Sequence, residues 1–179
     1  MKRVGLCLLI LASVSCGELT RQGTASSYLV ITQLTSDDGD QLRSDVVSDS
    51  GAIFEDLATV GFRLAMKDPA GAGPSSVNDI TVNRYRVKFI RADGRNTEGV
   101  DVPYAFDGAF TLTVSGTGSA AFALVRAQAK AEAPLKALGT NPVVISTIAQ
   151  ITFYGHDQTG REVLVNGQMS VHFANWNDD

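Results

Sequence analysis

Apolar and polar residues alternate most regularly along the C-terminal part of the chain, residues 143–173. Every second position is mostly apolar in residues 143–153 and again in residues 163–173, which is the pattern of strands with one buried face. The residues between them, 156–160, end in a glycine that can take the positive φ of a hairpin loop. The pattern therefore predicts an antiparallel pair of strands joined by a short turn.

Shorter alternating stretches precede this pair and are separated by turns rich in Gly, Pro and Asp. They predict strands at residues 27–35, 53–67, 79–92, 109–115 and 120–124, and weaker strand signals at residues 43–47 and 96–102. Within residues 79–92 the apolar positions change parity. A single-residue bulge near Asn83 and Arg84 would return both sets of apolar residues to the core face.

Residues 125–138 are the one stretch with helical character, because they are rich in Ala, Gln, Lys and Glu. Pro134 interrupts this stretch, since proline removes a backbone hydrogen bond and clashes with the preceding turn at a cost of roughly 3 kcal/mol. One short helix near residues 126–138 is therefore expected, before or after Pro134, in place of one unbroken helix over the whole stretch.

Seven or eight strands with one short helical crossover predict an all-β fold, an antiparallel β-sandwich, as a single domain over residues 27–179. The pattern resembles the immunoglobulin or fibronectin type III fold, without the cysteine pair and core tryptophan of antibody domains. Residues 85–89, 100–104 and 151–155 are also similar to stretches of secreted bacterial proteins with no assigned activity. That resemblance implies no reaction and no ligand.

The N-terminus has a different pattern. Two basic residues precede an apolar run at residues 4–14, about half the length that a bilayer crossing needs, so residues 1–15 are predicted to be a signal peptide. Ser15, Cys16 and Gly17 follow, and here the chain resembles a bacterial lipoprotein precursor, whose cysteine becomes diacylated and then forms the new N-terminus. Ser13 stands where that family usually has leucine. Residues 13–15 also fit an ordinary small-x-small cleavage site, which would release a soluble protein.

Lipidation would give a role to Cys16, which is the one cysteine left once Cys7 departs with the signal peptide. Two or more acyl chains hold a protein firmly to a membrane, at about 0.8 kcal/mol per buried methylene. Residues 16–26 are then the lipidated cysteine and a flexible tether that contributes no core residue. With Gly17 after the cysteine, the resemblance implies an exported protein anchored in the outer membrane. The alternative is a soluble periplasmic or secreted protein.

The charge of the chain argues against two classes of partner. Loss of Lys2 and Arg3 lowers the number of basic residues from 15 to 13 against 19 acidic ones, which changes the net charge from −4 to −6. Affinity for nucleic acid and for anionic lipid surfaces depends on clustered positive charge. We therefore expect no nucleic-acid partner, and expect membrane contact through the acyl chains on Cys16.

No motif for catalysis occurs in the chain: neither G-x-S-x-G, H-E-x-x-H nor a phosphate-binding loop. Its two histidines, His156 and His172, lie near opposite ends of the predicted C-terminal hairpin, so a shared metal is not expected. The prediction is a protein that is not an enzyme and has no cofactor or metal.

Four aromatic residues fall outside the core pattern. Tyr104 and Phe106 lie in a predicted loop that contains proline, Tyr154 borders the hairpin turn, and Trp176 lies in the tail. Aromatic rings on loops can stack on sugars or anchor a protein partner, and they can also close the open ends of a sandwich.

A basic stripe formed by Arg84, Arg86 and Lys88 occupies one face of the strand predicted at residues 79–92. It can bind a ligand, or it can be a solvated face paired with acidic residues on neighbouring strands. Together these patterns predict a lipid-anchored, non-catalytic cell-envelope protein that contacts another envelope protein. The alternative is a carbohydrate- or small-ligand-binding module that uses its loop aromatics.

Overall fold

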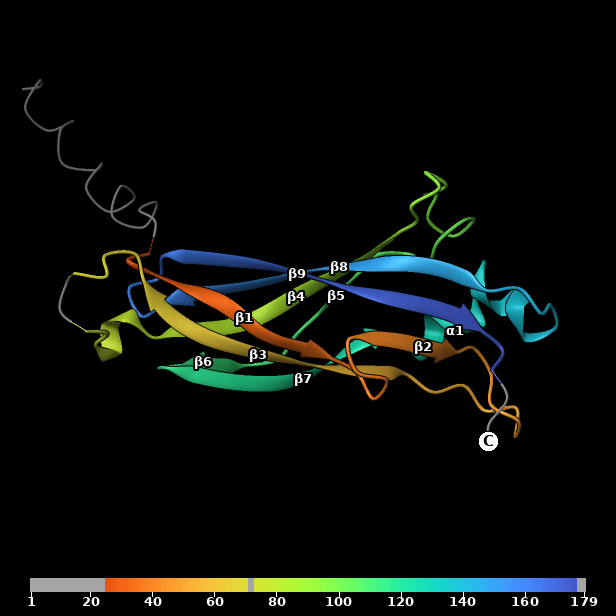
Figure 1. The fold of residues 1–179 in the computed structure, drawn as a ribbon, viewed down its shortest axis with the longest axis horizontal. Helices are drawn as coiled ribbons and strands as arrows, with labels where there is room; N and C mark the ends of the chain where they lie inside the picture. Colours follow the sequence, from red (N-terminus) through yellow and green to blue (C-terminus); the bar gives the residue numbers. More distant parts are fainter. Residues whose placement is uncertain (1–24, 71–72, 177–179) are drawn as a thin grey trace, which may run out of the picture.

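The computed structural model describes residues 25–70 and 73–176, whose strands form two packed sheets (Figure 1). The strands are β1 (Ser27–Thr35), β2 (Gln41–Asp45), β3 (Asp56–Met66), β4 (Ile80–Ile90), β5 (Phe106–Gly108), β6 (Leu112–Val114), β7 (Thr117–Val125), β8 (Ile145–Asp157) and β9 (Glu162–Ala174). The helical segments are η1 (Ser76–Asn78), α1 (Ala127–Ala131) and η2 (Leu135–Gly139). The predicted all-β sandwich with one short α-helix is confirmed.

The smaller sheet has the strand order β1-β3-β7, and the larger has the order β2-β9-β8-β4-β5, with β6 also paired to β4. The predicted C-terminal hairpin is confirmed, since β8 and β9 pair from Ile145–Phe173 to His156–Glu162. All of these pairings are antiparallel except that of β2, which runs parallel to the end of β9. Sequence alternation does not report this long-range parallel pairing.

Aromatic side chains from the two sheets meet in the centre of the core. The ring of Phe153 on β8 lies edge-on to Phe62 on β3 and Phe122 on β7, with ring centres 5.2 and 5.3 Å apart. Such T-shaped contacts add to the apolar area that each ring buries. Phe153 therefore joins the two sheets, as the inward parity predicted for the strands requires.

The predicted bulge in β4 is present. The pairing of β4 with β8 shifts register between Val82 and Arg84, and both Val82 and Tyr85 are buried. Two consecutive residues, Asn83 and Arg84, are consequently exposed on the outer face of the larger sheet. This is the effect expected of one extra residue in a strand whose side chains otherwise alternate.

The segment before β5 differs from the prediction. Residues 96–102 form a loop and not a strand, because the carbonyl of Thr97 accepts hydrogen bonds from the N–H groups of Asp101 and Val102 at 2.8 and 3.3 Å. This loop projects from the sandwich in Figure 1 (green). Phe106, expected in a loop, begins β5 and is only 4% exposed, because its ring packs edge-on against Tyr85. Of the strand predicted at residues 109–115, only β6 is present.

Pro134 separates α1 from η2, as its sequence position predicts. Lys130 on α1 is buried, and its ammonium group lies 2.8 Å from the carboxylate of Asp56 at the start of β3. The hydroxyl of Ser44 on β2 donates to the same carboxylate at 2.6 Å. Burial raises the pKa of Asp56, against the opposing effect of the hydrogen bond from Lys130. Through its contacts with Lys130 and Ser44, Asp56 connects α1 to both sheets.

The turn between β8 and β9 is organised by Asp157, which is almost fully buried. One of its carboxylate oxygens accepts hydrogen bonds from the N–H groups of Thr159 and Arg161 at 2.9 and 3.0 Å. Burial tends to raise the pKa of Asp157, but these hydrogen bonds and that of the Thr159 hydroxyl together lower it. Gly160 takes a φ of +82°, the positive value predicted for this turn.

The folded domain begins before β1. Ala25 is only 3% exposed, so it belongs to the packed domain and differs from the prediction that residues 17–26 contribute no core residue. The carbonyl of Ser26 accepts from the N–H of Lys67 at 3.0 Å, and its hydroxyl accepts from the Asn78 amide at 2.8 Å. The predicted signal peptide and Cys16 lie outside the described residues. Among the described residues, no helix is both long and apolar enough to cross a membrane.

Candidate functional site

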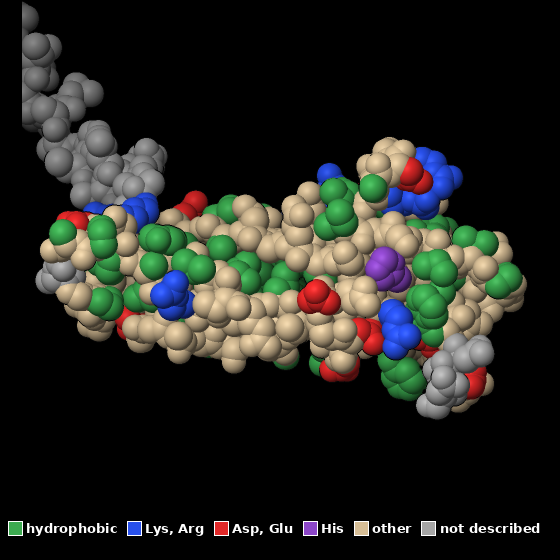
Figure 2. Space-filling view, in the orientation of Figure 1, with side chains coloured by type: hydrophobic (Ala, Val, Ile, Leu, Met, Phe, Trp, Pro, Cys, Tyr) green, Lys and Arg blue, Asp and Glu red, His purple; other side chains and the backbone are tan. Residues whose placement is uncertain are grey.

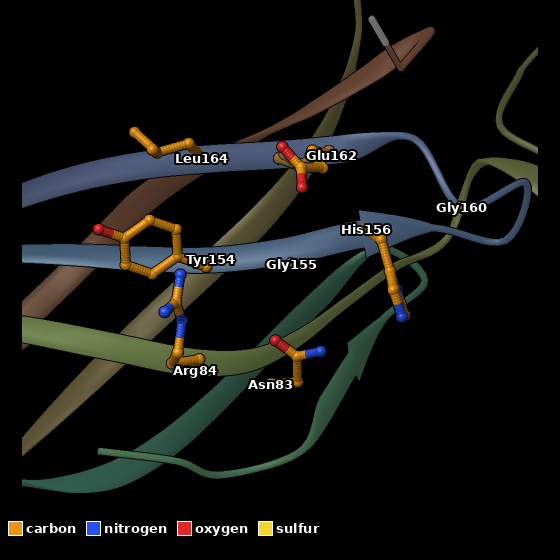
Figure 3. A pocket seen from close by; sticks show the side chains of 9 residues that line it. Asn83, Arg84, Tyr154, Gly155, His156, Gly160, Glu162 and Leu164 are labelled. Atoms are coloured by element: carbon orange, nitrogen blue, oxygen red, sulfur yellow. The ribbon is translucent and has the colours of Figure 1, made fainter. Parts of the chain in front are cut away.

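A pocket of about 370 Å³ opens on the outer face of the larger sheet, where β4, β8 and β9 run side by side (Figure 3). We call it the outer-face pocket. The side chains that define it are those of Asn83 and Arg84 on β4, Tyr154 and His156 on β8, and Glu162 and Leu164 on β9.

Strand register brings these residues together. Arg84 pairs with Tyr154, and Tyr154 pairs with Leu164, so these three residues form one row across the face. Gly155 has no side chain, so the pocket is lined by its backbone. A Cβ atom at Gly155 would lie 2.5 Å from the carbonyl oxygen of Thr81, because β4 approaches β8 closely beside the bulge. Glycine at this position is therefore a requirement of packing.

The guanidinium group of Arg84 lies against the ring of Tyr154, with its central carbon 4.1 Å from the ring centre. Stacking of this kind holds an arginine side chain in place and leaves its N–H edge free. Within the described part of the chain, Arg84 forms no salt bridge. The pocket thus contains a positioned cation without a paired carboxylate.

The rest of the basic stripe is different. Arg86 lies two residues further along the same face and forms a salt bridge of 2.7 Å with Asp107 on β5. The predicted pairing with acidic residues on neighbouring strands is confirmed for Arg86. Lys88 is exposed on the same face. Arg84 is the member of the stripe that lines the pocket.

The four predicted aromatic residues lie in separate places. Tyr154 lines the outer-face pocket, whereas Tyr104 is half-exposed and packs over Gly99 in the projecting loop. The buried ring of Phe106 is covered by the guanidinium group of Arg126, 4.4 Å from the ring centre, so it offers little surface to a ligand.

Trp176 follows the last strand. Its backbone N–H donates to the carboxylate of Asp45 at 2.9 Å, and the guanidinium carbon of Arg43 lies 6.0 Å from its ring centre. Both partners belong to β2, so Trp176 holds the end of the chain against that strand. It lies apart from the outer-face pocket, whose residues come from β4, β8 and β9.

A second hollow, of about 450 Å³, lies beside β2 and the helical segments, and we call it the end pocket. Its lining is mostly apolar and includes Val46, Val47, Ile53, Ala131 and Lys136. Phe54, which follows Ile53 in the chain, is 66% exposed. Sequence reasoning missed this region because it placed Ile53 and Phe54 inside a strand. Two adjacent large apolar residues, which cannot both face the core of a strand, were the available signal.

The two histidines are far apart along the hairpin. His156 pairs with Glu162 near the turn, whereas His172 pairs with Ser146 near the other end, where its Nδ1 lies 3.0 Å from the serine hydroxyl. Within residues 25–70 and 73–176, no group of three or more His, Cys, Asp or Glu side chains could hold a metal ion. No protein-family model matches the chain, and no curated protein shows significant similarity to it.

Proposed function

We propose that this chain is a lipid-anchored, non-catalytic protein of the cell envelope that contacts a partner protein with the end opposite its anchor. The anchor is Cys16, on the strength of the basic, apolar and small-residue pattern in residues 2–17. The contact surface is the end pocket together with the exposed apolar residues beside it.

The observation that carries this proposal is the position of the exposed apolar residues at the end of the sandwich opposite the start of β1 (Figure 1). Ser27, at the start of β1, pairs with Met66 at the end of β3. Ile53 and Phe54 precede Asp56, which begins β3, so they lie at the other end of the elongated sandwich (Figure 1). An anchor before Ser27 thus leaves the apolar end farthest from the membrane.

The apolar end has the character of a protein-binding surface. Phe54 is largely exposed, and Val143 and Val144, which precede β8, are about half-exposed. Figure 2 shows hydrophobic side chains at the right-hand end of the molecule, where β2 and β9 end, and others along the middle and left of the same face. Large exposed apolar side chains gathered in one patch are typical of sites that bind other proteins, since their burial provides most of the binding energy.

Site-specific photo-cross-linking in intact cells tests the contact surface. We expect a cross-linker at Phe54 to give one discrete adduct with an envelope protein. A cross-linker at Val77, which is half-exposed and lies beside the start of β1 through the contact of Asn78 with Ser27, is the matched control. Absence of an adduct from Phe54, or the same adducts from both positions, would contradict the proposed surface.

The anchor is tested separately by mass spectrometry of the mature protein. The expected N-terminus is Cys16 carrying diacylglycerol, and Cys16→Ser should move the protein from the membrane fraction to the soluble one or leave an uncleaved precursor. A wild-type protein that is soluble with a free Cys16 thiol would instead support ordinary cleavage after residues 13–15.

A second candidate function is the binding of a carbohydrate or another small ligand in the outer-face pocket. The specific observation in its favour is the row formed by Arg84, Tyr154 and Leu164, which places a positioned cation beside an aromatic ring and an exposed apolar side chain. Sugar sites commonly combine a ring surface with a few polar groups. This function is compatible with the anchor and uses a different face from the partner contact.

A further inference from the structure

We propose that the outer-face pocket binds a sugar that carries a single anionic group, either a carboxylate or a phosphate. The proposal deepens the second candidate function and rests on it. The pocket volume of about 370 Å³ is within the range of small-ligand sites and suits one sugar ring with its substituents.

Arg84 provides the recognition of the anionic group. Its guanidinium group is held against the Tyr154 ring at 4.1 Å, so its position is set before a ligand arrives. The free N–H edge of a guanidinium group can donate two parallel hydrogen bonds to a carboxylate or a phosphate. An arginine that is positioned and unpaired at a pocket therefore favours an anionic ligand over a neutral one.

Arg86 supplies an internal comparison. It occupies the same face of β4 and the same basic stripe, but its guanidinium group is already bonded to Asp107 at 2.7 Å. Arg86 also lies outside the residues that line the pocket. Two arginines of the same strand thus differ in the feature that matters, the availability of the guanidinium group to a ligand.

The other pocket residues fit the remainder of a sugar. The bulge exposes Asn83 beside Arg84, and its amide can both donate to and accept from hydroxyl groups. Figure 3 shows Glu162 and Leu164 on β9, at the edge of the pocket opposite β4. The Glu162 carboxylate can accept from hydroxyl groups and would repel a second anionic group. Leu164 and the Tyr154 ring offer apolar surface to the C–H face of the sugar ring.

The pocket lies at the end of the domain where β1 begins. His156 pairs with Thr81 at the start of β4, and the hydroxyl of Ser27 donates to the carbonyl of Asn78 just before that strand at 2.8 Å. With an anchor before Ser27, the pocket would lie toward the membrane surface. An anionic sugar there has two sources: the phosphorylated headgroup of a glycolipid, or the carboxylate-bearing unit of an acidic polysaccharide.

Titration of the purified full chain with soluble sugars, followed by calorimetry or NMR, tests the proposal. The probes are galacturonic acid, glucose 6-phosphate, galactose and glucose. We expect at least one acidic sugar to bind with a millimolar dissociation constant. The neutral sugars should bind at least about tenfold more weakly, because they lack the charged group that accepts hydrogen bonds from Arg84. Preference for galacturonic acid supports a polysaccharide source, and preference for glucose 6-phosphate supports a glycolipid headgroup.

Two matched variants decide whether Arg84 carries the recognition. Arg84→Gln should weaken binding of the acidic sugar by about tenfold or more, and Arg86→Gln by less than about twofold. Equal losses in both variants would show general attraction to a basic face and overturn the proposal, as would the absence of binding. Neutral sugars that bind as well as acidic ones would overturn the anionic preference and leave carbohydrate binding intact. These titrations involve neither a membrane nor a partner protein. A negative result would therefore contradict sugar binding alone, and would leave the partner contact tested by cross-linking at Phe54 unaffected.

Discussion

Replacement of Phe153 by alanine tests the arrangement of the core, because this one side chain joins the two sheets. Phe153 is 1% exposed, and its ring lies edge-on to Phe62 and Phe122 of the opposite sheet at 5.2 and 5.3 Å. Loss of the ring removes both contacts together with the apolar area that it buries. Phe62 and Phe122 both belong to the smaller sheet, so they cannot close the gap without a shift of that sheet against the larger one.

The expected cost follows from these contacts. Truncation of a core phenylalanine to alanine costs about 3–5 kcal/mol of unfolding free energy. Each lost edge-to-face pair contributes about 0.5–1.5 kcal/mol beyond burial. Because Phe153 loses two such pairs, we expect a value in the upper part of that range, about 4–5 kcal/mol. For a domain of this size, that corresponds to a fall in the melting temperature of roughly 8–20 °C.

Urea unfolding followed by circular dichroism is the appropriate measurement. The unfolding midpoint should fall while the slope of free energy against urea stays constant, because the variant buries nearly the same surface. Phe54→Ala is the matched control, and its effect should be within about 0.5 kcal/mol because the ring is exposed. Similar effects at Phe153 and Phe54 would mean that β8 presents its other face to the core, and the assignment of both sheets would then fail.

Three further variants test the turn, the bulge and the buried ion pair. Asp157→Ala should cost about 1–3 kcal/mol in urea unfolding at neutral pH. Hydrogen bonds hold the pKa of Asp157 in the folded protein below its ordinary value of 3.8. The difference in stability between wild type and variant should therefore be complete above pH 3.8, and should disappear as the pH falls through the lower pKa of the folded protein. Gly155→Ala should cost about 1–3 kcal/mol by thermal unfolding, because its Cβ would meet the carbonyl of Thr81; an unchanged melting temperature would contradict the close approach of the strands. Lys130→Met should cost about 3 kcal/mol in urea unfolding because it leaves Asp56 unpaired, whereas a double replacement of both residues by apolar ones should cost clearly less.

Local features of the fold followed closely from the sequence. Residues 27–35, predicted as a strand from composition and alternation, coincide with β1. The parity change at Asn83 predicted the bulge, and Pro134 predicted the break between α1 and η2. These features depend on neighbours a few residues apart, because side-chain alternation and proline sterics act over that distance.

Features set by distant residues did not follow. The loop at residues 96–102 depends on the Thr97 carbonyl, and the burial of Phe106 depends on Tyr85 and Arg126 in other elements. Alternation alone cannot distinguish such a loop from a weak strand.

The candidate site was predictable in parts. Tyr154 and the basic stripe were each identified from sequence, but their contact required the register of β4 against β8. Glu162 and Leu164 enter the pocket through the register of β9 against β8, which depends on the geometry of the turn between them as well as on the alternation. The end pocket depends on the packing of η2 beside β2, and neither segment has a sequence signal for the other.

The parallel pairing of β2 with the end of β9 also sets the order in which the domain can fold. Gln41 pairs with Ser170 and Asp45 with Ala174. Strand β2, near the start of the domain, therefore cannot pair until β9, the last strand to be synthesised, is available. Contacts between such distant residues form slowly, because a long loop must close before they contribute. A chain that emerges with its N-terminus first therefore keeps β2 unpaired, and the larger sheet incomplete, until nearly all of it is available.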